Sequence, residues 1–581
     1  MEPLRIWAPD AREVEAEMGD AGTRRPLEPA SGGWWELPAG EAPAGTRYRL
    51  RIDGEGPFPD PRSPWQPDGV HGPSCRLDHA AYPWQDTGWQ PPPLASGVVY
   101  ELHVGTFTAE GTFEAAIDRL DHLVALGVTH VELMPVAAFP GHHGWGYDGV
   151  DLFAPHEPYG GPEGLKRLVD ACHGRGLAVI MDVVYNHLGP DGNYLRQFGP
   201  YFTDRYGTPW GEAVNLDGAG SDEVRRFFCD NAAMWLRDYH CDGLRIDAVH
   251  AFHDRSAVHL LEQLADEVDA LAGHLGRPLV LIAESDLNDP RLIRPREVGG
   301  YGLTAQWNED FHHALHALLT GERDGYYADF GTADDLVRVL TRGFAYDGRY
   351  SRHRGRRHGR PADDRPGTAF VACLQNHDQI GNRARGDRTS ELLTDGQLRI
   401  GAAIVLTSPM VPMLYQGEEW AASTPFPYFC DHQDEQLAES VRRGRREEFA
   451  AFGWDPETIP DPQAASTVAS AQLDWQECAR DPHVSILEWH RELIALRRRL
   501  PELRDGRLDR VRVEVGPDDA WLVVHRGPTA VVCNLAGGSR TIPLAETGAR
   551  ELLLASPGVT VDGRGMTVPE HGVAIARLNR G

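Results

Sequence analysis

Three acidic residues follow three separate strand-like segments and could act together on one bond. Asp247 ends GLRID, Glu284 follows the apolar run VLIA, and Asp378 lies in LQNHDQ. Two carboxyl groups beside one bond are what glycoside hydrolysis requires, because one attacks the anomeric carbon while the other protonates the leaving oxygen. When the anomeric configuration is retained, the two groups lie about 5–5.5 Å apart. Neighbouring strands of one sheet would place Asp247 and Glu284 at such a separation.

Arg245 indicates which acid attacks. It precedes Asp247 by two positions, so both side chains lie on the same face of a strand. A cation beside Asp247 lowers its pKa, and we therefore expect Asp247 to be the ionised nucleophile. Burial after Val280–Ala283 would raise the pKa of Glu284 and suit it to act as the acid. Asp378 would bind sugar hydroxyls and stabilise the cationic transition state.

A single acid at a strand end more often caps a helix or ties loops together than it catalyses. Asp182, in VIMDVVYNH, could have such a structural role. The structural explanation is harder to apply to three acids that occur with Arg245, His187 and His377, all at predicted strand ends. The pattern as a whole favours a catalytic site.

The elements that position these residues alternate between strand and helix. Between Val98 and Leu500, short apolar runs are followed by amphipathic helical runs about eight times. This alternation predicts an α/β fold, a closed (β/α)8 TIM barrel whose active site lies at the carboxyl ends of the strands. The rival fold, an open doubly wound sheet, would carry a G-x-G-x-x-G turn after its first strand, and none occurs there.

The chain is long enough for further domains on either side of the barrel. Closely spaced turn residues and short strand-like runs predict an N-terminal β-sandwich over residues 1–92. We expect the barrel with its inserted loops over residues 93–505. A series of short strands, beginning with Val511–Val515, predicts a small C-terminal all-β domain over residues 506–581.

Four segments, DVVYNH, GLRIDAVH, IAES and QNHDQ, resemble the four signature stretches of the α-amylase family, in the family's order. The resemblance covers the barrel, and it implies that Asp247 is the nucleophile, Glu284 the acid/base and Asp378 the transition-state stabiliser. The residues that it implies for binding the attacked glucose are Tyr147, His187, Arg245, His377 and Gln379.

A further stretch, Gln306–Leu315 (QWNEDFHHAL), resembles the segment that binds a terminal trehalose unit in some members of this family. The resemblance implies contacts to that unit from Asp310, His312 and His313, joined by His250. The implied substrate is maltooligosyltrehalose, made by a maltooligosyltrehalose synthase. The implied reaction cuts the α-1,4 bond next to the trehalose end and retains the anomeric configuration.

Other functions use the same features. A glucan-branching transglycosylase would share the three acids, because a sugar hydroxyl replaces water as the acceptor, and another α-glucan hydrolase would share them too. A non-catalytic glucan-binding protein is a different class, and it predicts the loss of at least one acid, although all three are present. Trp145, Trp210, Trp307 and Trp420 could be sugar-stacking platforms or ordinary core residues.

Charge excludes several partners. The net charge of −29 repels nucleic acids and anionic membranes, so we expect neither as a partner. The basic run Arg352–Arg360 is therefore interpreted as a solvated loop. Lys166 is the single lysine of the chain, which excludes a Walker-type phosphate loop, and we expect it to lie on the solvated surface.

Cofactors and export signals are not indicated. The eight cysteines form no C-x-x-C pair and the histidines no H-E-x-x-H motif, so we expect no cofactor and no catalytic metal, although His312 and His316 share a helix face. The N-terminus has no signal-like apolar core, and no run is long enough for a membrane helix. We therefore expect a cytoplasmic protein with reduced thiols.

Overall fold

A closed barrel of eight parallel strands forms the centre of the molecule and confirms the predicted fold class. The computed structural model describes the whole chain except residues 1–2, 20, 451–458, 545–548, 563–564 and 579–581. The strands, in their order around the barrel, are β9 (Val99–Leu102), β10 (His130–Leu133), β13 (Ala178–Val183), β16 (Gly243–Ile246), β17 (Val280–Ala283), β18 (Ala305–Trp307), β21 (Phe370–Ala372) and β22 (Val411–Tyr415).

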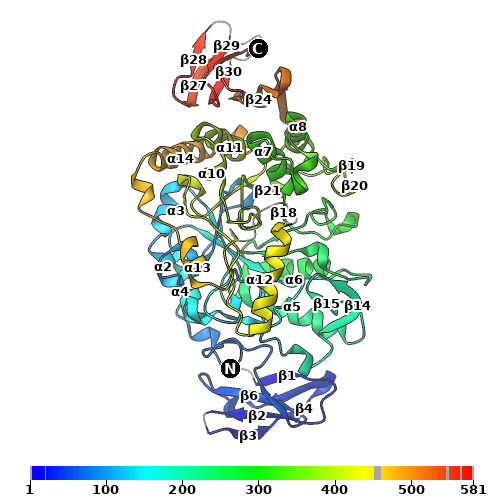
Figure 1. Cartoon of the computed structure of the whole chain (residues 1–581). Coiled ribbons are helices and arrows are strands. Elements are labelled where there is room, and N and C mark those ends of the chain that lie inside the picture. Colours follow the sequence, from blue (N-terminus) through cyan, green and yellow to red (C-terminus); the bar gives the residue numbers. More distant parts are fainter. Residues whose placement is uncertain (1–2, 20, 451–458, 545–548, 563–564, 579–581) are drawn as a thin grey trace.

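Helices surround the barrel, as the alternating sequence pattern predicts (Figure 1). The longer ones are α4 (Gly161–His173), α5 (Ser221–Arg237), α6 (Leu260–Leu275), α7 (Glu309–Thr320), α8 (Ala333–Arg342), α11 (Asp395–Thr407), α12 (Glu435–Ala450) and α14 (His483–Arg499). Two short helices, α2 (Phe113–Ile117) and α3 (Leu120–Leu126), lie between β9 and β10. No helix among the residues described is long and apolar enough to cross a membrane.

The interior of the barrel is apolar near the amino ends of the strands. One buried cluster includes Val99, Ile180, Ile282, Val371 and Val411, which come from five different strands. Successive residues of a strand point to opposite faces, so the residues two positions further along point inward nearer the carboxyl ends. The polar side chains at those positions are the ones that build the site.

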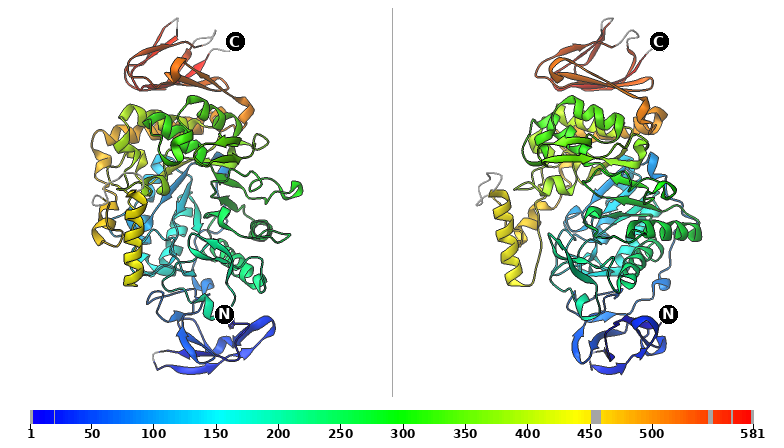
Figure 2. Two further views of the ribbon diagram at one scale, coloured as in Figure 1. Left: turned by 45° about the vertical axis from the view of Figure 1, so that its right-hand side comes forward. Right: turned by 90° about the vertical axis from the view of Figure 1, so that its right-hand side faces the viewer.

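Antiparallel sheets lie at the two ends of the molecule, on opposite sides of the barrel (Figures 1 and 2). Those of the N-terminal region contain β1 (Leu4–Trp7), β2 (Val14–Met18), β3 (Thr23–Pro26), β4 (Glu28–Pro29), β5 (Trp34–Leu37), β6 (Arg47–Ile52), β7 (Glu55–Phe58) and β8 (Ser74–Cys75). Those of the C-terminal region contain β23 (Val511–Val515), β24 (Trp521–Arg526), β25 (Thr529–Asn534), β26 (Arg540–Ile542), β27 (Ala549–Ala555), β28 (Thr560–Asp562), β29 (Gly565–Val568) and β30 (Val573–Leu578). The boundaries at residues 92 and 505 stay predictions.

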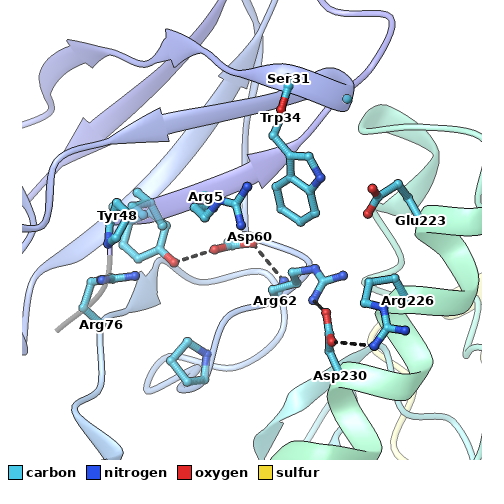
Figure 3. Close-up of a pocket in the computed structure, with 14 residues that line it drawn as sticks. Arg5, Ser31, Trp34, Tyr48, Asp60, Arg62, Arg76, Glu223, Arg226 and Asp230 are labelled. Carbon is cyan, nitrogen blue, oxygen red and sulfur yellow. Dashed lines mark hydrogen bonds and ion pairs between the residues drawn. The ribbon is translucent and has the colours of Figure 1, made fainter. Parts of the chain in front are cut away.

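The N-terminal sheets are tied to the barrel by an ion pair. Arg62 Nη1 donates to Asp230 Oδ2 of α5 at 2.8 Å, and the guanidinium of Arg62 also lies over the ring of Trp34, 5.3 Å from its centroid. Figure 3 shows these residues around a cavity of about 690 Å³ between the sheets and α5. Tyr48, on the sheet side of the cavity, donates to the buried carboxylate of Asp60 at 2.6 Å.

Lys166 is buried, so the expectation of a solvated surface lysine is wrong. Its exposed fraction is 2%. The Nζ atom donates to the carbonyl of His79 at 3.0 Å and lies near the rings of Tyr82 and Tyr239. The segment around His79, which comes from the N-terminal region, packs on the face of α4 that the sequence pattern assigned to solvent. Burial lowers the pKa of Lys166 to about 8.

Candidate active site

The three candidate acids gather at the carboxyl ends of the barrel strands. Asp247 directly follows β16, Glu284 directly follows β17, and Asp378 lies in the short helix α9 (His377–Gly381) after β21. The Asp378 side chain is the most open, with 42% exposed, whereas Asp247 and Glu284 are 13% and 9% exposed. The site is therefore a buried floor with one carboxylate open to solvent.

Arg245 contacts both of the acids expected to perform the chemistry. Its Nη1 donates to Asp247 Oδ1 at 2.7 Å, and its Nη2 lies 3.7 Å from Glu284 Oε2. The Arg245 side chain is completely buried. Because a single guanidinium reaches both carboxyl groups, they lie on the same side of the barrel mouth. This is the arrangement that two carboxyl groups need in order to act on one bond.

The backbone between the strands also holds Glu284. Ala248, next to Asp247, has a left-handed conformation with φ 40° and ψ 49°. Residues other than glycine rarely adopt this conformation, and it costs of order 1 kcal/mol or more. In return, the backbone N–H of Ala248 donates to Glu284 Oε2 at 2.6 Å. The strained residue thus fixes the position of one acid relative to the other.

The surroundings shift the pKa values of the two acids in opposite directions. Burial alone would raise the pKa of Asp247, but Arg245, His187 and a hydrogen bond from Asn186 lower it below its ordinary value. Burial raises the pKa of Glu284, and the negative charges of Asp247 and Asp378 raise it further against the effect of Arg245. A carboxylate beside a protonated carboxylic acid is the pair that a nucleophile and a general acid require.

A chain of hydrogen bonds surrounds Arg245 on its other side. Arg245 Nη1 also donates to both oxygens of Asp182 at 3.0 Å, and Tyr147 donates its hydroxyl to Asp182 Oδ2 at 2.7 Å. The Tyr147 oxygen lies 2.8 Å from His377 Nε2. Asp182 therefore ties loops and strands together, as a structural role would predict, and it does so inside the site.

His187 lies beside the candidate nucleophile. Its Nδ1 contacts Asn186, whose amide donates to Asp247 Oδ2 at 2.7 Å. Trp210 stacks on the His187 ring with centroids 4.4 Å apart and an angle of 2° between the planes. Trp210 is 48% exposed, whereas Trp145, Trp307 and Trp420 are buried. Of these four tryptophans, Trp210 is the one open enough to meet a sugar.

Gln379 and the residues expected to bind a trehalose unit have different surroundings. Gln379 caps α9, because its side chain accepts from the backbone N–H of Asn376. His250 is exposed, and it acts electrostatically on Glu284. His313 is buried and stacks on Tyr326 at a centroid distance of 4.8 Å.

Asp310 and His312 are engaged inside the protein. Asp310 Oδ2 accepts hydrogen bonds from Asn288 Nδ2 and from the backbone N–H groups of Ala345 and Tyr346, all within 2.8 Å. Both ring nitrogens of His312 are occupied, by the carbonyl of Leu374 and the hydroxyl of Tyr327. Their exposed fractions are 3% and 1%. The structure gives both residues packing partners, and their predicted sugar contacts stay predictions.

Sequence reasoning missed Glu309, which precedes Asp310 at the start of α7. Its carboxyl group interacts with that of Glu284. Burial, followed by the charges of Glu284 and Asp286, holds the pKa of Glu309 well above its ordinary value. A carboxylic acid at this position can donate a hydrogen bond beside the general acid. The signal was present as the acidic pair in QWNED, but the register of a helix start cannot be determined from sequence alone.

The basic run Arg352–Arg360 also reaches the site, so its interpretation as a solvated loop is only partly correct. It spans the tip of a hairpin formed by β19 (Asp347–Ser351) and β20 (Arg356–Gly359). Arg354 Nη1 donates to Asp286 Oδ2 at 2.9 Å. Asp286 follows Glu284 by two residues, so this ion pair lies at the rim of the site.

Metal ligands are not assembled in the part of the chain that the structure describes. No group of three or more His, Cys, Asp or Glu side chains there could hold a metal ion. His316, the possible partner of His312, instead contacts Glu322 Oε2 at 2.8 Å. All eight cysteines are free thiols.

A TIM barrel with carboxylates gathered around one arginine at its mouth defines a glycoside hydrolase of the α-amylase type. A family model described as the catalytic domain of alpha amylase matches residues 84–204. A malto-oligosyltrehalose trehalohydrolase of Arthrobacter ramosus is 53% identical over 99% of both chains, and one of Saccharolobus solfataricus is 45% identical over 85% of both. A crystal structure of a putative alpha amylase from Salmonella typhimurium is 37% identical, covers 100% of this chain and 97% of its own, and superposes with a TM-score of 0.90. The chain belongs to the malto-oligosyltrehalose trehalohydrolase family.

Proposed function

We propose that this protein hydrolyses the α-1,4-glucosidic bond next to the terminal trehalose of maltooligosyltrehalose. Full-length relatives that carry the name of this activity support the proposal. The observation that carries the chemistry is the contact of Arg245 with both Asp247 and Glu284. The products would be trehalose and a maltooligosaccharide shortened by that unit.

In the first step, Asp247 attacks the anomeric carbon while Glu284 gives its proton to the glycosidic oxygen. The carbon–oxygen bond breaks, and trehalose leaves with that oxygen as a hydroxyl group. The remaining oligosaccharide is then an ester of Asp247. Asp378, the open carboxylate, would bind hydroxyls of the same glucose and stabilise the positive charge that develops on the ring.

In the second step, Glu284 accepts a proton from water, which attacks the same carbon from the face that trehalose left. The negative charge of Asp247 is one cause of the raised pKa of Glu284. That charge disappears when Asp247 becomes an ester, so the pKa of Glu284 falls when a base is needed. Two inversions restore the original anomeric configuration.

We assign recognition of the trehalose end to residues that interact with Glu284, because Glu284 protonates the oxygen of the leaving trehalose. His250, Asp286 and Glu309 all interact electrostatically with one another or with Glu284, and Arg354 holds Asp286. Together they offer hydrogen-bond donors and acceptors to a leaving disaccharide. We infer that these residues, with His313 behind them, line the trehalose subsite.

The test is a product assay on maltooligosyltrehalose beside a plain maltooligosaccharide of equal length. We expect rapid release of trehalose from the first substrate only, with α-configured products visible by proton NMR before mutarotation. New α-1,6 branches would indicate a branching transglycosylase instead. Binding of both sugars without turnover would indicate a non-catalytic glucan-binding protein.

The substrate also places the enzyme in a reaction sequence. Its trehalose end arises when another enzyme converts the reducing end of a maltooligosaccharide, so we infer that this protein acts after a maltooligosyltrehalose synthase. Free thiols at all eight cysteines agree with a cytoplasmic location, which we include in the proposal. Nucleic acids and membranes have no part in it.

A further inference from the structure

Inside the barrel, the carboxylate of Glu101 on the first strand contacts His377. Glu101 lies on β9 two positions after Val99, so it shares the inward face of that strand. Its Oε1 lies 2.5 Å from His377 Nδ1, and its Oε2 accepts from the backbone N–H of His377 at 3.2 Å. Both side chains are 1% exposed. We propose that Glu101 is a positioning residue for the reaction, which keeps His377 doubly protonated and thereby sets the direction of the hydrogen bonds around Asp182.

Counting protons along the chain of contacts supports this role. The Glu101 carboxylate can only accept, so His377 Nδ1 carries a proton. His377 Nε2 lies 2.8 Å from the Tyr147 oxygen, which lies 2.7 Å from Asp182 Oδ2. If Nε2 also carries a proton, Tyr147 accepts from His377 and donates to Asp182, and every contact is satisfied. If Nε2 is bare, the single Tyr147 proton faces two acceptors.

Asp182 itself is better described as a carboxylate than as a carboxylic acid. Both of its oxygens accept from Arg245 Nη1 at 3.0 Å, in addition to the bond from Tyr147. Arg245 Nη1 and the Tyr147 hydroxyl are the two donor atoms directed at this carboxyl group, and the contact with the Arg245 cation favours its charged form, which cannot donate a hydrogen bond. Asp182 therefore does not supply the missing hydrogen bond to Tyr147, and His377 must supply it.

The charges around His377 identify Glu101 as the group that maintains this state. The titratable and charged side chains that face His377 are Glu101, His103, Glu132, Tyr147, Asp182, Arg245 and Asp378. Burial alone would lower the pKa of His377, but Glu101 first and Asp378 second raise it to about 9 against the effect of Arg245. Asp378 is 3.6 Å away and partly exposed, so its influence is more screened by solvent than that of Glu101.

The consequence reaches Asp182 and, through Arg245, the nucleophile. Burial raises the pKa of Asp182 to about 7, while Arg245, the Tyr147 hydrogen bond and His377 act to lower it. A neutral His377 would no longer lower the pKa of Asp182 by its charge, and it would compete with Asp182 for the hydrogen bond that Tyr147 donates. Asp182 would then take up a proton near neutral pH and release Arg245, which also holds Asp247.

Glu132 provides a matched control on the neighbouring strand β10. It is 1% exposed, and neither carboxyl oxygen has a hydrogen-bond partner among the described residues. Burial, then the charges of Glu101 and Asp182, hold its pKa well above the ordinary value, which favours the neutral form of Glu132. Glu132→Gln therefore keeps both shape and charge, whereas Glu101→Gln keeps shape and removes a charge.

The first measurement is the pH dependence of kcat and KM for wild type, E101Q, E101D and E132Q. For E101Q we expect kcat at pH 8 to fall about tenfold or more relative to wild type, with a smaller loss at pH 6, where the His377 ring holds its second proton without Glu101. E101D should recover part of the loss, and E132Q should follow wild type. A ratio of wild-type to E101Q activity that does not change with pH, or equal losses in E101Q and E132Q, would overturn the proposal.

The second measurement does not need turnover, so it separates this inference from the proposed function on which the kinetic assay rests. Histidine labelled with ¹⁵N reports ring protonation directly, and H377N identifies the signal of His377 by its absence. We expect the doubly protonated ring at pH 7.5 in wild type and the neutral ring in E101Q. A neutral His377 in the wild-type protein would refute the proposal even if E101Q failed to fold.

Discussion

Replacing Arg245 by methionine tests the charge balance on which the whole site depends. The guanidinium is completely buried and contacts Asp182 at 3.0 Å, Asp247 at 2.7 Å and Glu284 at 3.7 Å. Removing one partner of a buried ion pair costs about 3–5 kcal/mol, because the other charge is left without compensation. Asp182 can take up a proton near neutrality, since its pKa is about 7. We therefore expect R245M to lose about 3 kcal/mol of stability at pH 7, near the lower end of that range.

The loss should depend on pH in a defined direction. Without the guanidinium, the folded-state pKa values of Asp247 and Glu284 lie above their unfolded-state values near 4. The folded protein then binds more protons than the unfolded chain, so stability falls as pH rises through the folded-state pKa values. The difference between wild type and R245M in guanidinium unfolding should therefore be larger at pH 8 than at pH 5.

A surface ion pair provides the comparison. Arg12 is 87% exposed and contacts Asp53 at 3.4 Å, and exposed ion pairs contribute little to stability, so R12M should cost far less than R245M at either pH. Activity gives a second readout, because Asp247 loses its nearest cation in R245M, and each unit by which its pKa exceeds the assay pH lowers the ionised fraction tenfold. A destabilisation by R245M as small as that of R12M, or one independent of pH, would show that the three carboxylates do not depend on Arg245.

Three further outcomes follow from the structure. Asp247→Asn keeps the side-chain shape, so the protein should fold while kcat falls by about five orders of magnitude, as expected for a lost nucleophile; near wild-type turnover would disprove that role. Asp310→Ala leaves two buried backbone N–H groups unpaired, and we expect a loss of about 3 kcal/mol in thermal or denaturant unfolding; an unchanged stability with a raised KM would instead favour direct contact with the sugar. Although burial opposes it, hydrogen bonds from His173 and His240 lower the pKa of Asp86, so its contribution to stability is present above about pH 4 and is lost progressively as pH falls from there toward the folded-state pKa. Asp86→Asn should therefore reduce the difference in stability between pH 6 and pH 3, and an identical difference in both proteins would argue against this ion pair.

The barrel could be predicted because its strands are buried on both faces. Such strands appear as short continuous apolar runs, and the helices between them carry an apolar stripe every three or four residues. The contact between Arg245 and Asp247 was predictable for a similar reason. A spacing of two residues within a strand fixes a common face, whatever the rest of the fold.

The side of the site that depends on helix register could not be predicted in the same way. Glu309 and Asp310 are adjacent, but successive residues of a helix point about 100° apart. The structure directs Glu309 toward Glu284 and gives Asp310 to the backbone of residues 345 and 346. A shift of one residue in the start of α7 would exchange these roles, and sequence patterns do not define a helix start that closely.

The contacts of two other residues depend on segments far away in the sequence and could not be predicted. Glu101 interrupts the apolar run VVYELHV, and a buried charge within a strand requires a partner, so its importance was detectable from the sequence. Its partner, His377, lies 276 residues later and could not be identified in this way. Lys166 is covered by a segment 87 residues earlier in the chain. The apolar pattern of α4 predicts which face of the helix packs on the barrel, but it does not predict what covers the other face.

Specificity for a trehalose end cannot reside in the three acids, because every retaining enzyme with this chemistry needs a nucleophile and an acid. It must arise where the leaving group lies, beyond Glu284. There the structure places Glu309, whose pKa burial holds well above its ordinary value, and the ion pair of Asp286 with Arg354, which extends from the β19–β20 hairpin. A disaccharide joined through both anomeric carbons has no free reducing end, so a subsite that recognises it must bind hydroxyls of the second glucose. Charged groups held by one another, and not by the sugar, can bind such hydroxyls without leaving a buried charge unpaired when the product departs.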